Sequence, residues 1–499
     1  MNDLASEPMT ASPNSLGLDF NTPALQRKRR IRAFKDRLAR WCVSIGGLAV
    51  LGAITLIFFY LAYVVLPMFQ GADLEKRDAV QPAWLANAGK PLLMTLEEQN
   101  QVGMRLASDG KIQFFDAQSM EALTTIDLPL PAGTEVVSVG EDQPGSHRVA
   151  LGLSNGQALV FEHAYRITYP DDVKTITPSI VYPFGEAPLT IDPQGRPLEH
   201  MGISVNSGTL LIAGSVGSEL QVLSLSREEN MMTGEVEVSE ERLALPQIAE
   251  PIKELIIEPR QHWLFVINGR ATADVFDLRA KALNGRYKLL NDGAREVTHV
   301  TSLLGGISLL IGDSAGGISQ WFMVRDEDGK SDLKQVREFK MADSPVSQII
   351  PEERRKGFIA LDEKGNLGIF HSTAHRTLLV EPVAEGHSIA ALSPRANRVL
   401  VEANGKIERI LVDNPHPEIS WSSLWGKVWY ENYDKPEYVW QSTSASTDAE
   451  PKLSLAPLAF GTLKAAFYAM LLAAPLAIAA AIYTCLLYTS DAADDLLCV

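Results

Sequence analysis

Apolar residues are concentrated in two long runs, one near each end of the chain, whereas the region between them alternates apolar and polar positions. The first run, residues 43–69, contains no charge over 27 residues, and about 20 are enough to cross the hydrocarbon core of a membrane. A secretory signal has a shorter apolar stretch of ~7–15 residues and a small-residue cleavage site, which the sequence near Pro67 lacks. We therefore predict a retained transmembrane helix over residues 41–69, with Trp41 at its membrane interface.

A cluster of basic residues directly precedes this run, within the tail formed by residues 1–40. Only Asp36 opposes the cluster, whose members are Arg27, Lys28, Arg29, Arg30, Arg32, Lys35, Arg37 and Arg40. Because positive residues flank the cytoplasmic end of a membrane helix, we expect a cytoplasmic tail and an extracytoplasmic region after residue 69. The formal net charge of −16 argues against a nucleic-acid binder, whose footprint is a basic patch or stripe.

The middle region, residues 70–415, repeats a unit in which a glycine-containing turn is followed by alternating apolar residues. Such a turn supplies the positive φ of a tight hairpin, and the alternation is typical of a strand with one buried face. Successive turn glycines are 46, 61, 52, 48, 48 and 40 residues apart: Gly110, Gly156, Gly217, Gly269, Gly317, Gly365 and Gly405. Paired strands every ~40–50 residues are typical of propeller blades with four strands each.

We therefore predict an all-β, propeller-like domain of about seven blades, with an elongated pair of β-sandwiches as the alternative. A sandwich pair would not predict so regular a period. We expect residues near the C-terminal end of the domain to complete the first blade and close the ring. The three cysteines, Cys42, Cys485 and Cys498, all lie outside the middle region, so no disulfide holds it together.

Nothing in the middle region indicates chemistry. The run Gly329-Lys330-Ser331 resembles the end of a phosphate-binding loop, but Val324 stands where that motif needs its first glycine. The spacing of nearby acidic residues also fails the calcium-loop pattern: Asp326, Asp328 and Asp332. The histidines lack metal-ligand spacing and we expect them at the surface; His371 and His375 fall at a strand end. We predict a chain that is not an enzyme, with no catalytic residue, cofactor or metal site.

Tryptophan is concentrated in the segment 416–453, which holds four of the eight in the chain. Trp421, Trp425 and Trp429 recur at i, i+4 and i+8, a spacing that places them on one face of a helix, and Trp440 follows. A helix that closes the domain core is one explanation. Because a second apolar run follows shortly after, we favour an aromatic, amphipathic connector at the membrane surface.

The second apolar run, residues 454–484, is rich in alanine and leucine, carries only Lys464 as a charge and contains Pro475. Small residues allow close helix packing in membranes, and proline is tolerated where neighbouring helices satisfy the backbone. We predict a second transmembrane helix that packs against partners.

Residues 460–484, FGTLKAAFYAMLLAAPLAIAAAIYT, resemble the start of the permease core of ABC importers. There a Gly-Thr-Leu motif, here Gly461, Thr462 and Leu463, precedes an alanine-rich helix that ends in Ala-Ile-Tyr. With KLSLAPLAF and the aromatic segment, the sequence is most similar to the phosphate ABC transporter permease subunit in its version with a large insertion after the first membrane helix. The resemblance covers residues 417–484 and the first membrane segment. The family's cytoplasmic coupling loop and most of its helices are absent, so no phosphate-contacting residue is carried over.

The resemblance implies phosphate import in a bacterial inner membrane, with residues 70–453 in the periplasm. It also implies a second permease subunit, cytoplasmic ATPase subunits that hydrolyse ATP, and a periplasmic phosphate-binding protein, besides membrane lipid. The expected fold is thus a mixed membrane protein: an N-terminal helix, a propeller-like domain and the start of an α-helical permease core. The alternative is a membrane-anchored β-propeller scaffold or assembly factor of the cell envelope.

Residues 485–499, CLLYTSDAADDLLCV, break the apolar pattern and do not resemble the family's continuation. A transposase-end sequencing adapter, translated in one frame, reads Cys-Leu-Leu-Tyr-Thr-Ser and then Asp-Ala-Ala-Asp, as in this segment. We therefore predict that residues 485–499 derive from an adapter and that the permease is truncated here. Sequencing across this junction in the source genome tests the prediction.

Overall fold

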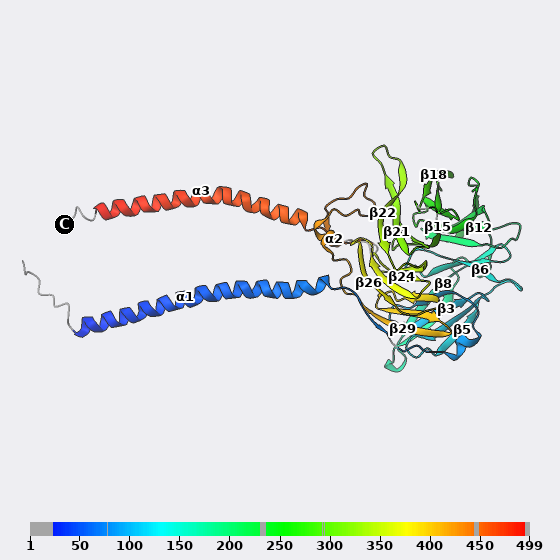
Figure 1. Cartoon of the computed structure of the whole chain (residues 1–499), viewed down its shortest axis with the longest axis horizontal. Helices are drawn as coiled ribbons and strands as arrows, with labels where there is room; N and C mark the ends of the chain where they lie inside the picture. Colours follow the sequence, from blue (N-terminus) through cyan, green and yellow to red (C-terminus); the bar gives the residue numbers. More distant parts are fainter. Residues whose placement is uncertain are drawn as a thin grey trace, which may run out of the picture. The chain divides into compact units, whose positions relative to one another are not determined.

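The computed structural model describes residues 23–76, 78–229, 236–291, 293, 295–443 and 449–494. The chain divides into two units, Met1–Met68 and Phe69–Val499. Helix α1, Pro23–Val65, forms the first unit, and the 3-10 turn η1, Leu66–Phe69, leads to the second. The second unit contains the β-domain, a connector and helix α3, Ala456–Asp494 (Figure 1).

Among the residues that the structure describes, the strands of the middle region form seven antiparallel sheets, which are the blades of a β-propeller. The first blade contains β2 Pro91–Leu96, β3 Val102–Ala107, β4 Lys111–Asp116 and β5 Ala122–Asp127. The second blade contains β6 Val136–Glu141, β7 Arg148–Leu153, β8 Gln157–Thr168, β9 Thr175–Val181 and β10 Leu189–Thr190. The third blade contains β11 His200–Asn206, β12 Thr209–Val216, β13 Glu219–Glu229 and β14 Val236–Leu243. The short 3-10 turns η2, Ala83–Asn87, and η3, Pro170–Asp172, lie between strands.

The next three blades each have four strands in sequential order. They contain β15 Ile252–Ile257, β16 Trp263–Asn268, β17 Thr272–Asp277 and β18 Ala282–Lys288; β19 Val297–Ser302, β20 Ser308–Asp313, β21 Gly317–Arg325 and β22 Ser331–Lys340; and β23 Val346–Pro351, β24 Gly357–Asp362, β25 Asn366–His371 and β26 Arg376–Pro382. The seventh blade combines β27 His387–Leu392, β28 Arg398–Ala403 and β29 Lys406–Asp413 with β1, Asp73–Lys76, from the start of the domain.

This seventh blade closes the ring, because β1 pairs antiparallel with β29. The two ends of the domain do meet in one blade, but the expected direction was wrong. Residues near the N-terminal end complete the last blade, whereas residues near the C-terminal end were expected to complete the first. The prediction of a propeller is confirmed, and the β-sandwich alternative is excluded by the strand order.

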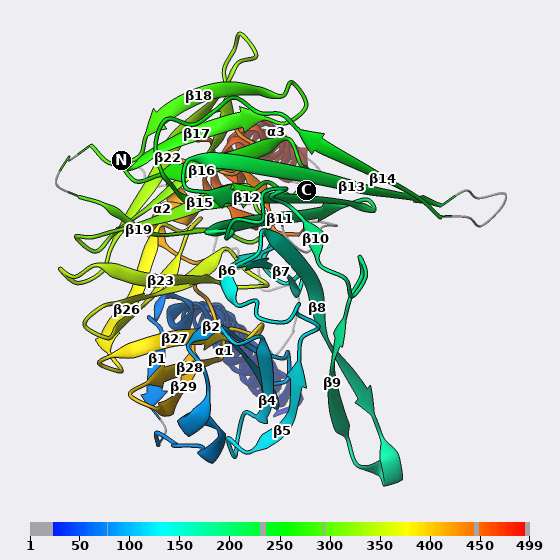
Figure 2. The same ribbon diagram turned by 90° about the vertical axis from the view of Figure 1, so that its right-hand side faces the viewer.

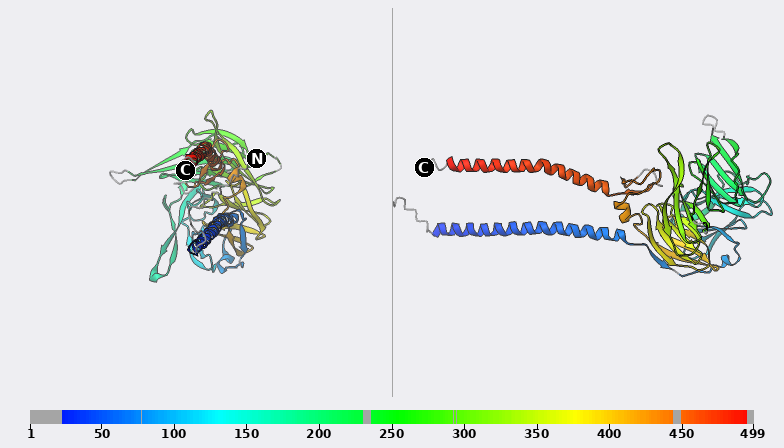
Figure 3. Two further views of the ribbon diagram at one scale, coloured as in Figure 1. Left: turned by 90° about the vertical axis from the view of Figure 1, so that its left-hand side faces the viewer. Right: turned by 45° about the horizontal axis from the view of Figure 1, so that its top comes forward.

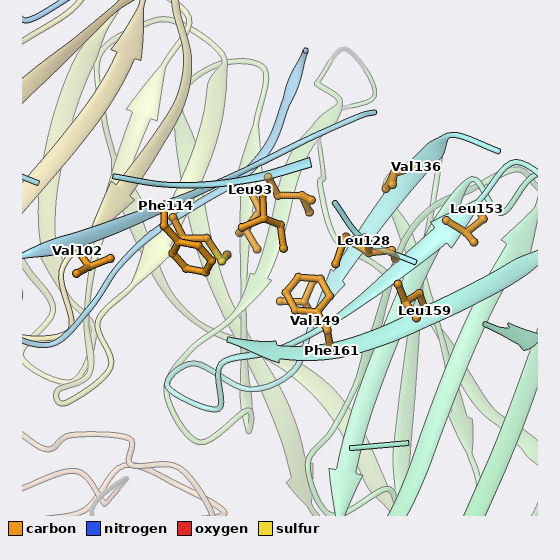
Figure 4. Close-up of a cluster of buried hydrophobic side chains, with 13 residues drawn as sticks. Leu93, Val102, Phe114, Leu128, Val136, Val149, Leu153, Leu159 and Phe161 are labelled. Carbon is orange, nitrogen blue, oxygen red and sulfur yellow. The ribbon is translucent and has the colours of Figure 1, made fainter. Parts of the chain in front are cut away.

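Apolar clusters between neighbouring blades form the core. One such cluster joins the first and second blades through Phe114, Phe161 and Val149 (Figure 4). Another joins the seventh blade to the first, where Phe115 meets Leu400 and Ile407. The sheets follow one another around a ring, and the hairpins β8–β9 and β13–β14 project from it (Figure 2).

The repeated glycines lie where the chain turns from the second to the third strand of each blade, and Gly317 is itself the first residue of β21. Gly110, Gly156, Gly217, Gly365 and Gly405 all have positive φ, which a residue with a Cβ adopts only at a cost. Two blades differ from the prediction: Gly316 rather than Gly317 takes the positive φ, and Ala271 takes it in place of Gly269.

Two helical segments of the described residues are long and apolar enough to cross a membrane, Gln26–Phe69 and Ala456–Leu486; they contain 18-residue stretches with mean hydropathies of 2.5 and 2.1. Each helix is continuous, and α3 curves along its length (Figure 3). Pro475, which removes a backbone donor, lies inside α3. Helix α1 begins at Pro23, so the basic cluster is helical and continuous with the apolar run. Helix α3 runs past Thr484 to Asp494, and the adapter origin of residues 485–499 stays a prediction.

Candidate functional site at the junction face of the propeller

The chain enters and leaves the propeller at the same end of the seventh blade. Asp73, the first residue of β1, lies opposite Asp413, the last residue of β29. In the other six blades, this end carries the loops that join the first strand to the second and the third to the fourth. We call it the junction face.

Arg376, the first residue of β26, holds the two ends of the domain together. One terminal nitrogen of its guanidinium donates to the carbonyl oxygens of Phe69 and Gln70, at 2.9 and 2.6 Å. The other donates to the carbonyl of Ile419 at 2.8 Å. Phe69 also stacks on Trp421, with ring centroids 5.4 Å apart. The planar fork of arginine suits this bridging role better than the ammonium of lysine.

We expect Arg376→Ala to release the two ends of the domain without unfolding the blades. Limited proteolysis of the detergent-solubilised chain should show cleavage near residues 66–72 and 414–420 about tenfold faster, because local opening governs cleavage. The matched control is Arg166→Ala, which alters an exposed arginine in the part of β8 that extends beyond its pairing with β7, here called the β8 overhang. Unchanged cleavage in Arg376→Ala would show that the bridge does not hold these segments.

The connector does not form the amphipathic helix that the tryptophan spacing predicts. Helix α2 covers only Trp421–Trp425 and begins with a capping box between Ser420 and Ser423. It ends at Gly426, whose backbone is extended. From there the chain turns into an isolated bridge between Val428 and Glu437. The strand pair β30 Trp440–Gln441 and β31 Lys452–Leu453 follows before α3 begins.

The tryptophans of the connector therefore have different environments. Trp421, Trp425 and Trp440 are exposed, and their place at a membrane interface stays a prediction, as does that of Trp41 in α1. Trp429 is docked on the propeller instead: its ring packs edge-on against Phe322, and its indole N–H donates to the carbonyl of Tyr433 at 2.8 Å. Trp429 does not share a helical face with Trp421 and Trp425, because the helix ends before it; its place at a membrane interface stays a prediction.

A buried ion pair fastens the connector to the junction face. Lys356, between the first two strands of the sixth blade, donates from Nζ to Glu431 of the connector at 2.6 Å, and the two side chains are only 3% and 6% exposed. The same ammonium donates to the carbonyl of Leu304, and Ser308 donates to the other oxygen of Glu431, each at 2.6 Å. Buried charges are tolerated when they are paired and hydrogen-bonded in this way.

A second set of buried polar groups continues this contact. Arg337 donates to Gln320 at 2.9 Å and also to the carbonyl of Trp429. Glu450 accepts from the backbone N–H of Glu431 at 2.7 Å and from the Thr373 hydroxyl. Burial, with the charge of Glu431 as the next cause, raises the pKa of Glu450. The connector is thus held by charge-assisted bonds at several points, which fix its position on the propeller.

The central channel contains a cavity of about 310 Å³ at the ends of the inner strands. Glu141 lies in its wall, and desolvation by the surrounding protein, followed by the charge of Glu353, raises the pKa of Glu141 to about 7. His163 is 4% exposed, and burial lowers its pKa to about 3, with His147 as the next cause. The rings of His147 and His163 stack at 4.6 Å. Glu254 also lines the cavity, and burial raises its pKa to about 7 as well.

Glu141 gives the stability of the chain a pH dependence of defined sign. Its pKa is about 7 in the folded chain, against an ordinary value of 4.5. The folded chain therefore binds this proton more tightly than the unfolded chain does. The stability that this contributes is fully present below the ordinary pKa of 4.5 and is lost as the pH rises through the folded pKa of about 7. We expect the unfolding temperature to fall between about pH 4.5 and about pH 7, and Glu141→Gln to reduce this fall. Thermal scans at these pH values test this, with exposed Glu121→Gln as control; an equal fall in both variants would contradict it.

The residues considered for chemistry in the sequence lie apart from one another. Gly329, Lys330 and the acidic residues beside them form the tip of the β21–β22 hairpin, where the Gly329 N–H donates to Asp326 O at 3.0 Å. His371 was expected at the surface but is 1% exposed, and burial lowers its pKa to about 3. In the part of the chain that the structure describes, no three His, Cys, Asp or Glu side chains gather as metal ligands.

The family-motif residues lie in the second turn of α3. Leu463 is exposed, a side chain at Gly461 would meet no atom within 4 Å, and the Thr462 hydroxyl donates to Leu458 O at 2.9 Å. They contribute nothing to the junction face. Sequence reasoning missed the residues that do build it, above all Arg376, Lys356 and Glu431. An isolated charge in a strand-rich sequence gives no sign that it is buried, and the partners are up to 307 residues apart.

No protein-family model and no curated protein matches the chain. Solved structures that match include the β-propeller domain of Cps50 (Swd1) from Myceliophteria thermophila, with 10% identity and a TM-score of 0.46 over 68% of this chain and 100% of that one. Raptor from Chaetomium thermophilum matches with 17% identity and a TM-score of 0.45, over 66% of this chain and 28% of that one. These values concern the fold only, and the assignment of seven blades rests on the strand pairings.

Proposed function

We propose that this chain is a membrane-anchored β-propeller that serves as a docking platform for other proteins of the cell envelope. The observation that carries the proposal is the continuation of both ends of a closed propeller into long apolar helices. The apolar 18-residue stretches of α1 and α3 have none of their residues buried inside the structure. Such surfaces need lipid or other membrane helices to cover them.

The basic cluster at the start of α1 is the basis for the orientation that we propose for the chain in the membrane. The N-terminus lies in the cytoplasm, and the propeller lies on the opposite side of a bacterial inner membrane. Among the residues that the structure describes at the junction face, no nucleophile is paired with an activating base, and the role that we assign to this face is binding.

Alkaline carbonate extraction of membranes tests the anchoring. The full chain should stay in the membrane pellet, and protease added from the extracytoplasmic side should digest the propeller. Replacing Leu51, Ile54 and Leu56 in α1 together with Leu471 and Leu472 in α3 by arginine should release it, because each central arginine costs about 2.5–3.5 kcal/mol. Arginines at exposed Leu123 and Val137 are the matched control. Extraction of the wild-type chain by carbonate would overturn the proposal.

A second candidate function is favoured by the surface of α3. Over Ala456–Leu486 this helix is exposed, rich in alanine and contains Pro475, features that suit close packing against other membrane helices. We propose on this ground that the chain belongs to the permease subunit of an ATP-driven phosphate importer. It would then act with a second permease subunit, cytoplasmic ATPase subunits and a periplasmic phosphate-binding protein.

Deleting the complete gene tests the second candidate. Uptake of radioactive phosphate at low concentration should fall sharply and return when the intact gene is restored. Glutamate uptake in the same cells controls for general membrane damage. Normal phosphate uptake after deletion would reject the transport function while leaving the anchored platform in place.

A further inference from the structure

A groove on the junction face lies between the fourth and fifth blades and is bordered by the connector. Its volume is about 690 Å³, within the range of ligand-binding clefts. The loop after β15, the β21–β22 hairpin and residues 432–434 of the connector form its walls. It is separate from the central cavity, which the inner strands line.

The floor of the groove is apolar and aromatic. Trp263 and Met323 are partly exposed there, and Tyr433 of the connector closes one side. The ring of His262 stacks on Trp263 at 4.1 Å, and its Nε2 lies 3.3 Å from Asp277, which fixes the aromatic pair. Rigid aromatic surfaces of this kind supply most of the contact energy in recognition of apolar side chains.

The rim of the groove is basic. Arg260 is exposed and makes no hydrogen bond or ion pair with the described residues. Arg325 uses only Nε, which donates to the carbonyl of Gly329 at 3.1 Å, so its terminal nitrogens are available. Lys330 adds a third positive charge, paired on one side with Asp332 at 3.1 Å.

The acids that line the groove are mostly engaged within the protein. Glu258 is 8% exposed and accepts from the backbone of His262 at 3.3 Å. Asp277 accepts from the backbone N–H groups of Arg279 and Ala280, at 2.9 Å each. Asp434 is exposed and is the one acid of this lining without a partner among the described residues. Within this lining, unused donors thus outnumber unused acceptors, although exposed Glu327 and Asp328 stand at the tip of the β21–β22 hairpin outside it.

We propose that this groove binds an extended, acidic segment of a partner protein. The carboxylates of the segment pair with Arg260 and Arg325, and its apolar side chains lie on Trp263 and Met323. Arginine forks bind carboxylates through two parallel hydrogen bonds, which orients the segment as well as holding it. The proposal deepens the docking role and rests on it, but the groove can fail its test while the membrane anchoring stands.

Fluorescence anisotropy on the full chain in phosphatidylcholine nanodiscs tests this proposal. The probe is a fluorescein-labelled peptide, Asp-Leu-Glu-Phe-Asp-Leu-Glu, and the comparison is the same peptide with lysine at every acidic position. We expect saturable binding of the acidic peptide only, weakening as salt is raised because exposed charges are screened. No saturable binding at millimolar peptide, or equal binding of the lysine peptide, overturns the proposal.

Variants place the binding in the groove. The double variant Arg260→Glu with Arg325→Glu should weaken binding of the acidic peptide at least about tenfold, because like charges then face each other. Asp434→Asn should strengthen it by removing the free acid. Arg166→Glu on the β8 overhang is the matched control and should change nothing. Unchanged binding in the double variant, or competition for the groove by phosphatidylglycerol vesicles without peptide binding, overturns the proposal.

Discussion

Replacing Lys356 by methionine should lower the free energy of unfolding of the propeller by about 3–5 kcal/mol. The ammonium is 3% exposed and is the close partner of Glu431. Its removal leaves the buried carboxylate with a neutral hydroxyl donor, Ser308, and without a directly bonded positive charge, since Arg337 bonds to Gln320 and the Trp429 carbonyl instead. Urea unfolding of the detergent-solubilised chain, followed by tryptophan fluorescence, measures the loss.

Two comparisons separate this effect from a general loss of lysine. Lys364→Met changes an exposed lysine that donates only to the carbonyl of Asp343, and it should alter stability by less than about 0.5 kcal/mol. The double variant Lys356→Met with Glu431→Leu should be more stable than Lys356→Met alone, because it removes the uncompensated charge. A double variant less stable than Lys356→Met alone would contradict the account.

Phe115→Ala should cost about 3–5 kcal/mol, the usual effect of removing a buried aromatic ring. Phe115 is fully buried where the first blade meets the seventh, against Leu400 and Ile407, and its ring lies 5.1 Å from that of Trp84. The substitution opens a cavity at the junction that closes the ring. Loss of cooperative unfolding in urea, and not only a lower midpoint, is the expected result.

Leu123→Ala provides the control for this second prediction. Leu123 is half-exposed in β5 of the same blade, so truncating it removes little buried surface and should leave the midpoint almost unchanged. An equal loss in both variants would show that the first blade responds to any truncation and that the closing contact has no special weight.

The blades and the apolar helices were predictable because their signals are local. A turn glycine and the strand after it lie within about ten residues, and an apolar run is a property of one segment. The junction face was not predictable in this way. Arg376 reaches back 307 residues to Phe69, and Lys356 meets Glu431 75 residues further on, so neither residue looks different from a surface charge.

The tryptophan spacing shows how a correct local rule fails when one residue overrides it. Trp421, Trp425 and Trp429 fit one helical face, yet Gly426 ends the helix between the second and third of them. The direction of ring closure also escaped prediction, because β1 has only four residues and two of its four are acidic. Its pairing with β29 follows from the tertiary structure rather than from an apolar pattern.

The bridge made by Arg376 has a consequence for how such a chain can be altered. One guanidinium spans the carbonyls of Gln70 and Ile419, so the two points where the propeller joins the rest of the chain are close enough for a few residues to connect. Domains with adjacent termini can be inserted or removed with little disturbance of their host. A shortened chain that links Gln70 to Ser420 should therefore keep both apolar helices in their proposed membrane orientation. The propeller is thus a domain that can be removed or replaced by another.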